Sequence, residues 1–156
     1  KATIMKDEVK NETITLKDIN GKEIIETPIE KGFTFSDFEN KVVLVNFFAT
    51  WCPPCKAEIP HLIELKNKYS DKFNVISVLL EENKSPAEVS SFIKEHKINY
   101  FVSTEESANF EAAKIFGVKG FPTMFLFDKD GKKIAFYPGA TPAEIIEQDI
   151  LKTVGK

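Results

Sequence analysis

Two cysteines carry the most reactive side chains in this sequence. Cys52 and Cys55 are its only cysteines; they enclose Pro53 and Pro54 and follow directly after Trp51, the single tryptophan. A thiolate can attack a substrate disulfide, and a second thiol nearby can then resolve the mixed disulfide that forms. The spacing therefore predicts thiol–disulfide exchange at this pair.

The segments on either side of the cysteines predict how they are held. Residues 42–48 form a nearly unbroken apolar run, which is typical of a strand covered on both faces. Residues 56–65 carry apolar side chains at helical spacing. A strand, a sharp turn and a helix would place Cys52 at the helix N-terminus, where unpaired N–H groups and the helix dipole favour a thiolate. Cys55 would lie one turn further in, within disulfide reach and more shielded.

Composition and charge limit the class of protein. With 156 residues, 42% of them hydrophobic and 29% charged, the chain fits one globular domain, and its 14 phenylalanines are expected to pack the core. The formal net charge is −3 and there is no long basic run, which argues against a nucleic-acid partner. The sequence has no arginine, so bidentate guanidinium contacts with phosphate or carboxylate are excluded.

The first residues are expected to lie outside the folded domain. Residues 1–12 are charged and aperiodic, which indicates a flexible lead-in or the stub of a tether before a domain over residues 13–156. No apolar run approaches the roughly 18–20 residues that a membrane span needs. The chain begins at Lys1, so a signal peptide or membrane anchor is expected to have preceded it, and membrane contact is expected only through such an anchor.

Turn dipeptides and helix-capping residues divide the rest of the chain. Asn20 and Gly21 both tolerate positive φ and lie between short apolar runs, which predicts an N-terminal hairpin with a two-residue turn. Residues 33–38 are expected to form a short turn or helix start. Ser85 and Thr141 each precede a proline and, three residues on, a glutamate, a pattern that predicts helix starts.

The remaining elements complete an alternating pattern. Strands are predicted at 75–80, 100–102, 123–127 and 133–137. The helix after the cysteines is expected to end near Tyr69, with a kink at Pro60. The helix that starts at Ser85 should end near His96, and a further helix should run from Ser107 to Phe116 and be ended by Gly117. The order is a hairpin followed by β-α-β-α-β-α-β-β-α. It indicates an α/β fold with a central mixed sheet flanked by helices.

Residues 46–60, with the sequence NFFATWCPPCKAEIP, resemble an active-site signature of the thioredoxin-like superfamily, and most closely that of its extracytoplasmic TlpA/ResA/DsbE-like branch. The segment Gly120-Phe121-Pro122-Thr123 is similar to the one that carries the superfamily's cis-proline. The resemblance extends over about residues 13–154. It includes the N-terminal hairpin and an inserted helix–strand unit near residues 85–102.

The resemblance implies roles for the residues of the motif. Cys52 would be the attacking thiol and Cys55 the resolving thiol. Pro122 would lie beside the disulfide after a cis peptide bond, and the backbone of Phe121 would then pair with an extended substrate. Trp51 is expected partly to pack and partly to shield the site.

Acidic residues near the cysteines are candidates for proton transfer. Asn46 stands where cytosolic thioredoxins carry a buried aspartate, and an amide cannot exchange protons. Glu58, three residues after Cys55 on the same helical face, is the first candidate, with a solvated helix residue as the other interpretation. Glu82 is a possible second acid and Glu81 its alternative. His61 and His96 are expected at the surface rather than as ligands.

The two prolines between the cysteines favour one direction of electron flow. Pro53 and Pro54 lack N–H groups that could stabilise a Cys52 thiolate, which predicts a reducing rather than an oxidising couple. The resemblance implies an extracytoplasmic reductase that receives electrons from a membrane thiol–disulfide transporter and reduces protein disulfides, with apocytochrome c as the leading substrate. No cofactor is expected beyond the redox-active disulfide.

Other functions remain open at this point. The same cysteines could serve an oxidase or isomerase. A peroxiredoxin-like peroxidase would need a Thr-x-x-Cys arrangement and an arginine, but Thr50 is only two residues before Cys52 and arginine is absent. The non-enzymatic alternatives are a zinc-binding module, which would need ligands beyond the two cysteines, a redox-inert adaptor, and a purely structural disulfide.

Overall fold

The computed structural model describes residues 12–154 of the chain. Their centre is a five-stranded sheet in the order β6-β5-β4-β7-β8, in which β4, β5 and β6 are parallel and β7 and β8 each run antiparallel to their neighbours. The strands are β4 (Val42–Phe48), β5 (Phe73–Leu79), β6 (Phe101–Ser103), β7 (Thr123–Phe127) and β8 (Lys133–Tyr137). The predicted α/β fold with a central mixed sheet is confirmed. The expected lead-in lies outside the described residues, except for Glu12.

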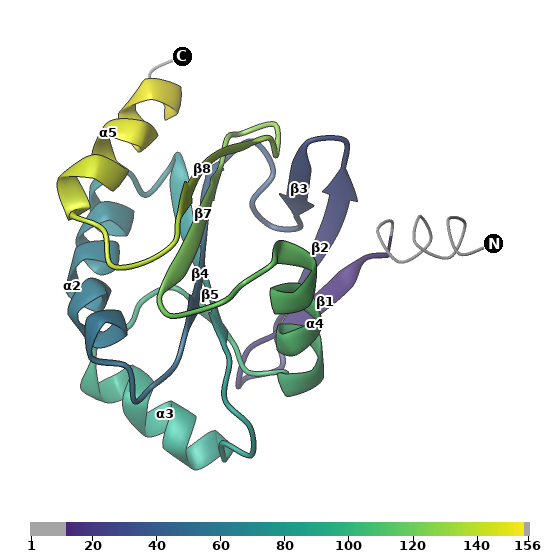
Figure 1. Cartoon of the computed structure of the whole chain (residues 1–156), viewed down its shortest axis with the longest axis vertical. Coiled ribbons are helices and arrows are strands. Elements are labelled where there is room, and N and C mark those ends of the chain that lie inside the picture. The colour runs from purple at the N-terminus through teal and green to yellow at the C-terminus, as the bar shows by residue number, and fades with distance from the viewer. Residues whose placement is uncertain (1–11, 155–156) are drawn as a thin grey trace.

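Helices cover both faces of this sheet (Figure 1). They are α2 (Pro53–Lys68), α3 (Pro86–Glu95), α4 (Glu106–Phe116) and α5 (Ala143–Val154). In Figure 1, α2 and α5 lie on one side of the sheet, and α4 lies on the other side beside a small N-terminal sheet. Each face has its own hydrophobic cluster, and the fully buried strand β4 contributes to both because its side chains alternate between the faces.

The N-terminal segment differs from the predicted hairpin. It is a three-stranded antiparallel sheet of β1 (Ile14–Lys17), β2 (Glu23–Ile29) and β3 (Gly32–Phe35). The turn or helix start predicted over residues 33–38 is therefore wrong for its first half, because pairing with β2 extends residues 32–35 into a strand. The turn between β2 and β3 also contacts the turn between β7 and β8, where the Phe33 N–H donates to the Gly131 carbonyl at 2.9 Å.

The predicted N-terminal hairpin is present, but its turn is not a two-residue turn. Gly21 has a φ of 86°, and its N–H donates to the Asp18 carbonyl at 3.0 Å. The Asp18 carboxylate accepts from the N–H groups of Asn20 and Lys22, each at 2.9 Å. This side chain satisfies the turn's donors, so only Gly21 needs positive φ. Asp128 and Gly131 make the same contacts between β7 and β8.

Most helix boundaries follow the predicted capping residues. Ser85 and Glu88 form the complete capping box at the start of α3, and Gly117, with a φ of 73°, ends α4. The predicted inserted unit corresponds to α3 and β6. Pro60 lies inside α2, which runs on without interruption to Lys68. None of the helices in the described part of the chain is long and apolar enough to span a bilayer.

Candidate active site

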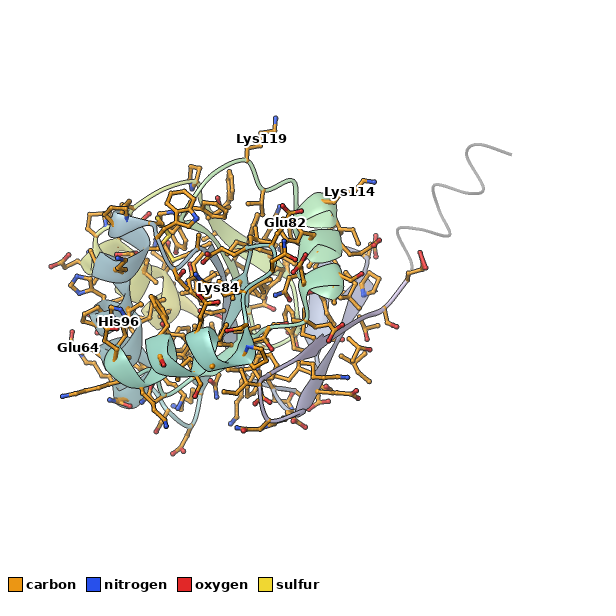
Figure 2. The ribbon with its side chains drawn as sticks, turned by 90° about the horizontal axis from the view of Figure 1, so that it is seen from below. Glu64, Glu82, Lys84, His96, Lys114 and Lys119 are labelled. Carbon is orange, nitrogen blue, oxygen red and sulfur yellow. A yellow bond between two sulfur atoms is a disulfide. The ribbon has the colours of Figure 1, made fainter. Side chains whose placement is uncertain are left out.

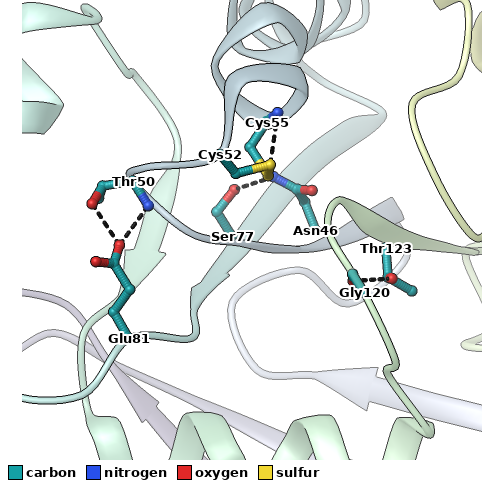
Figure 3. The surroundings of a disulfide bond; sticks show 8 residues. All are labelled: Asn46, Thr50, Cys52, Cys55, Ser77, Glu81, Gly120 and Thr123. Carbon is teal, nitrogen blue, oxygen red and sulfur yellow. Dashed lines mark hydrogen bonds between the residues drawn. A yellow bond between two sulfur atoms is a disulfide. The ribbon is translucent and has the colours of Figure 1, made fainter.

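The cysteine pair lies at the junction between β4 and α2 (Figure 3). Cys52 is the N-cap residue of α2, and its Sγ accepts a hydrogen bond from the backbone N–H of Cys55 at 3.2 Å. The two residues are joined by a disulfide, with their Cα atoms 5.2 Å apart. Only 3% of Cys52 and 2% of Cys55 is exposed, so the buried ends of β4 and α2 hold both sulfurs in place.

The first turn of α2 offers Cys52 few hydrogen-bond donors. Pro53 and Pro54 occupy its first two positions, and neither has a backbone N–H. Among the described residues, the Cys55 N–H is the one donor bonded to the Cys52 sulfur. The helix N-terminus, normally a favourable place for negative charge, is thus less stabilising here than in a helix without these prolines.

A second loop completes the surroundings of the disulfide. The Phe121–Pro122 peptide bond is cis, as the resemblance implied, and Pro122 is buried. The next residue, Thr123, begins β7 opposite Phe47 of β4, so the cis-proline loop lies at the end of the sheet that carries the cysteines. Trp51, 63% exposed, packs edge-on against the Phe121 ring with the centroids 5.8 Å apart. An exposed aromatic surface therefore adjoins the disulfide.

Glu58 is buried on the same face of α2 as Cys55. Only 5% of it is exposed, which rules out the interpretation as a solvated helix residue. Among the described residues, its Oε2 has no hydrogen-bond partner. Burial raises the pKa of Glu58, while His61 and the backbone N–H of Thr141 act in the opposite direction. A carboxyl group of this kind is suited to exchanging a proton with a neighbouring thiol.

Of the two acids considered after β5, Glu81 rather than Glu82 contacts the active-site loop. Its carboxylate accepts hydrogen bonds from the backbone N–H and the hydroxyl of Thr50, each at 2.5 Å, and lies 3.3 Å from Lys84 Nζ. Burial raises the pKa of Glu81, but the Thr50 hydrogen bonds and Lys84 outweigh it and hold the pKa below its ordinary value. Glu82 is exposed, and Figure 2 shows it with Lys84 on the segment after β5.

Beside the site, the buried core holds Asn46, which the sequence singled out, and two further polar side chains, Ser77 and Tyr100, which the sequence analysis missed. The Asn46 amide donates to the Ser77 hydroxyl at 3.2 Å, because the two residues are paired in the register of β4 and β5. Tyr100, 8% exposed, lies close enough to Ser77 and Glu58 for both to act on the pKa of its phenol. Burial raises the pKa of Tyr100, so this phenol stays neutral. The signal available for Ser77 was a polar residue inside the apolar strand run 75–80.

The two histidines lie apart from the disulfide sulfurs. His61 is exposed on α2, and His96 caps α3 with its ring 4.3 Å from that of Phe92. Across residues 12–154, no three His, Cys, Asp or Glu side chains are grouped so that they could hold a metal ion. The polar arrangement at the site is therefore one of thiols, a carboxyl group and hydroxyl groups.

Comparisons with known proteins agree with this geometry. A family model described as Redoxin matches residues 8–154. A thiol-disulfide oxidoreductase ResA from Bacillus thuringiensis is 35% identical over 122 residues, which are 78% of this chain and 69% of the relative. The ResA of Oceanobacillus iheyensis is 30% identical over 131 residues, 83% of this chain and 66% of that protein.

Solved structures show the same fold. A protein from Chlorobium tepidum, named as thiol:disulfide interchange protein DsbE, superposes with a TM-score of 0.75 at 27% identity, covering 94% of this chain and 96% of that one. A thiol:disulfide interchange protein from Bacteroides sp. superposes with a TM-score of 0.73 over 93% of this chain and 88% of that chain; at 22% identity it supports the fold alone.

Proposed function

Because the chain belongs to the Redoxin family and is a thiol–disulfide oxidoreductase, we propose that it works as a reductase of protein disulfides. The observation that carries this direction is the shortage of donors at Cys52. Its sulfur receives one backbone N–H bond from the described residues, and Pro53 and Pro54 supply none. A protein whose thiolate is well stabilised favours its own reduced form and therefore acts as an oxidant of other thiols. A poorly stabilised thiolate has the opposite effect and makes the protein a reductant.

In the proposed reaction the two cysteines act in turn. The Cys52 thiolate attacks one sulfur of the substrate disulfide, a mixed disulfide forms, and the other substrate sulfur leaves as a thiolate. Cys55 gives its proton to the Glu58 carboxylate and attacks Cys52, which releases the second substrate thiolate and forms the Cys52–Cys55 disulfide. Two electrons pass to the substrate, and its two thiolates take up two protons.

The surface around Cys52 is proposed to bind the substrate chain. Trp51, Pro53 and Pro54 are exposed beside the buried Cys52, and Phe121 contacts Trp51. An extended substrate segment laid along the backbone before Pro122 would form strand-like hydrogen bonds there. Main-chain pairing depends little on substrate side chains, so this surface suits protein disulfides of varied sequence.

We propose a location outside the cytoplasm and a role in cytochrome c maturation. Support comes from the resemblance to the TlpA/ResA/DsbE-like branch. The substrate would be the Cys-x-x-Cys-His disulfide of apocytochrome c. A membrane thiol–disulfide transporter would re-reduce Cys52–Cys55, because a reductant in an oxidising compartment needs an electron supply. No dissociable cofactor is needed for these steps.

The proposal is tested by mixing the reduced protein with an oxidised Cys-x-x-Cys-His peptide and with the same peptide carrying Ala for His. We expect transfer of reducing equivalents to both peptides, with faster reduction of the first if the site is adapted to apocytochrome c. Cys55→Ser should trap a mixed disulfide through Cys52, whereas Cys52→Ser should trap none. Net oxidation of the reduced peptides by the protein disulfide would contradict the reductase assignment.

A further inference from the structure

Three titratable side chains follow one another along α2 from the core to the solvent. Cys55, Glu58 and His61 are each three residues apart. In a helix of 3.6 residues per turn, three residues advance about 300°, so each step lies one turn on and rotates about 60° around the axis. The rotation carries the series out of the core, because Cys55 is 2% exposed, Glu58 is 5% exposed and His61 lies at the surface.

Glu58 needs a partner that can take a proton to water. The titratable or polar groups that act on it are His61 on α2, the Tyr100 phenol before β6 and the Thr141 N–H before α5. Tyr100 stays neutral because its burial disfavours the phenolate, and a backbone amide does not exchange protons in turnover. Histidine is the side chain that ordinarily gains and loses protons near neutral pH. His61 is also the exposed member of this group.

One oxygen of the Glu58 carboxyl group is left without a hydrogen-bond partner. Glu58 Oε2 is buried and has no hydrogen-bond partner among residues 12–154, so it is free to accept a proton. A proton that arrives there from Cys55 must leave before the next turnover. The buried side of α2 offers the neutral phenol of Tyr100, whereas the next turn of the helix offers His61.

We infer that His61 carries protons between the buried Glu58 carboxyl group and the solvent during each redox cycle. This inference rests on the proposed role of Glu58 as the group that accepts the Cys55 proton. Cys55 loses its proton to Glu58 as it attacks Cys52, Glu58 passes that proton to His61, and His61 releases it to water. The same steps run in reverse when an electron donor reduces the disulfide and Cys55 is protonated again. His61 is thus a positioning residue, since it acts through Glu58 and does not touch the substrate.

The test follows the resolving step directly. Reduced protein should react with 5,5′-dithiobis(2-nitrobenzoate) in two phases, of which the second is the attack of Cys55 on the mixed disulfide at Cys52. Stopped-flow absorbance gives the rate of that phase across the pH range, at low and at high imidazole concentration. Four variants are compared with the unaltered chain: His61→Gln, His61→Lys, Glu58→Gln and, as a matched control on the other histidine, His96→Gln.

We expect His61→Gln to slow the second phase, to move its Glu58-dependent transition to higher pH, and to make its rate rise with imidazole. The transition should rise because a cation beside Glu58 favours the carboxylate. His61→Lys should keep the transition near its original pH but show the same rescue by imidazole. His96→Gln should behave as the unaltered chain does.

Two results overturn the inference, and they are distinguishable. If Glu58→Gln changes the pH profile while His61→Gln leaves both the profile and the imidazole dependence unchanged, the relay through His61 is wrong and the role of Glu58 stands. If Glu58→Gln itself leaves the profile unchanged, the role of Glu58 falls and the relay falls with it.

Discussion

The Thr50 contacts of Glu81 fix the loop that leads to Cys52. One carboxylate oxygen receives two donors from Thr50, one from the backbone and one from the side chain, and Lys84 balances its charge. The loop between β4 and α2 is thereby tied to the segment that follows β5. Thr50 lies two residues before Cys52 in the sequence, whereas Glu81 is 31 residues from Thr50. Glu81 therefore acts as a positioning group for the site.

Replacing Glu81 tests that role. We expect Glu81→Gln to lower the free energy of unfolding by about 1–2 kcal/mol near neutral pH, since hydrogen bonds to a charged acceptor are replaced by neutral ones. The pKa of Glu81 is lowered in the folded protein, so its contribution is present above the ordinary value of 4.5 and is lost as pH falls through the folded pKa. Urea unfolding at neutral and acidic pH measures the difference, which should shrink in acid.

Glu82→Gln is the matched control for this variant, because Glu82 is the exposed neighbour. It should leave the free energy of unfolding within about 0.5 kcal/mol of the unaltered chain, as surface substitutions usually do. Equal losses for both variants would refute the positioning role of Glu81.

Strand β2 carries a carboxyl group into the core. Glu26 lies between Ile14 of β1 and Phe35 of β3 and is 1% exposed. Neither of its carboxyl oxygens has a hydrogen-bond partner among the described residues. Burial raises the pKa of Glu26 from 4.5 to about 8. The N-terminal sheet therefore packs best with this side chain protonated.

Stability should consequently fall as pH rises. The contribution of the protonated Glu26 is complete below the unfolded value of 4.5 and is lost as pH rises to the folded value of about 8. The gap between these values corresponds to roughly 4–5 kcal/mol, an upper estimate for the loss between about pH 5 and pH 9. Urea unfolding should show that loss in the unaltered chain and not in Glu26→Gln.

Glu23→Gln serves as the control on the same strand, because Glu23 is exposed. It should keep the pH dependence of the unaltered chain. An unfolding free energy whose pH dependence is the same with and without Glu26 would show that the carboxyl group is not buried as described.

The two glycine turns at the far end of the molecule form a second contact between elements. A Cβ on Gly32 would lie 1.8 Å from the Gly131 carbonyl oxygen, so the turns approach each other as closely as two backbones can. We expect Gly32→Ala to lower the free energy of unfolding by about 1–3 kcal/mol, as overpacking does. Gly139→Ala, which meets nothing within 4 Å, should change it little.

The rate of thiol–disulfide exchange in Gly32→Ala shows whether the loss of stability reaches the active site. Gly131 follows the C-terminal end of β7, whereas the cis-proline loop precedes the N-terminal end of β7. The variant should therefore keep the exchange rate of the unaltered chain while it loses stability. A parallel fall in rate would mean that the glycine contact also supports the active site.

At the scale of the whole molecule, the features that depend on a few neighbouring residues could be predicted from the sequence, whereas contacts between distant segments could not. The apolar run of β4, the capping box at Ser85 and the spacing of Cys55 and Glu58 depend on a few neighbouring residues, and each was predictable. Strand β3 was missed because its extended form depends on pairing with β2. The contact of Glu81 with Thr50 and that of Asn46 with Ser77 each join residues 31 apart in sequence. Only the register of β4 with β5 brings these pairs together.

The reduction potential of the Cys52–Cys55 pair tests the central claim most directly. Equilibration with glutathione or dithiothreitol can be followed through the fluorescence of Trp51, which adjoins the disulfide and is the single tryptophan. A value near or below roughly −220 mV is expected, since Cys52 has few donors to stabilise its thiolate. A value near about −120 mV would make the protein an oxidant and contradict the assignment as a reductase.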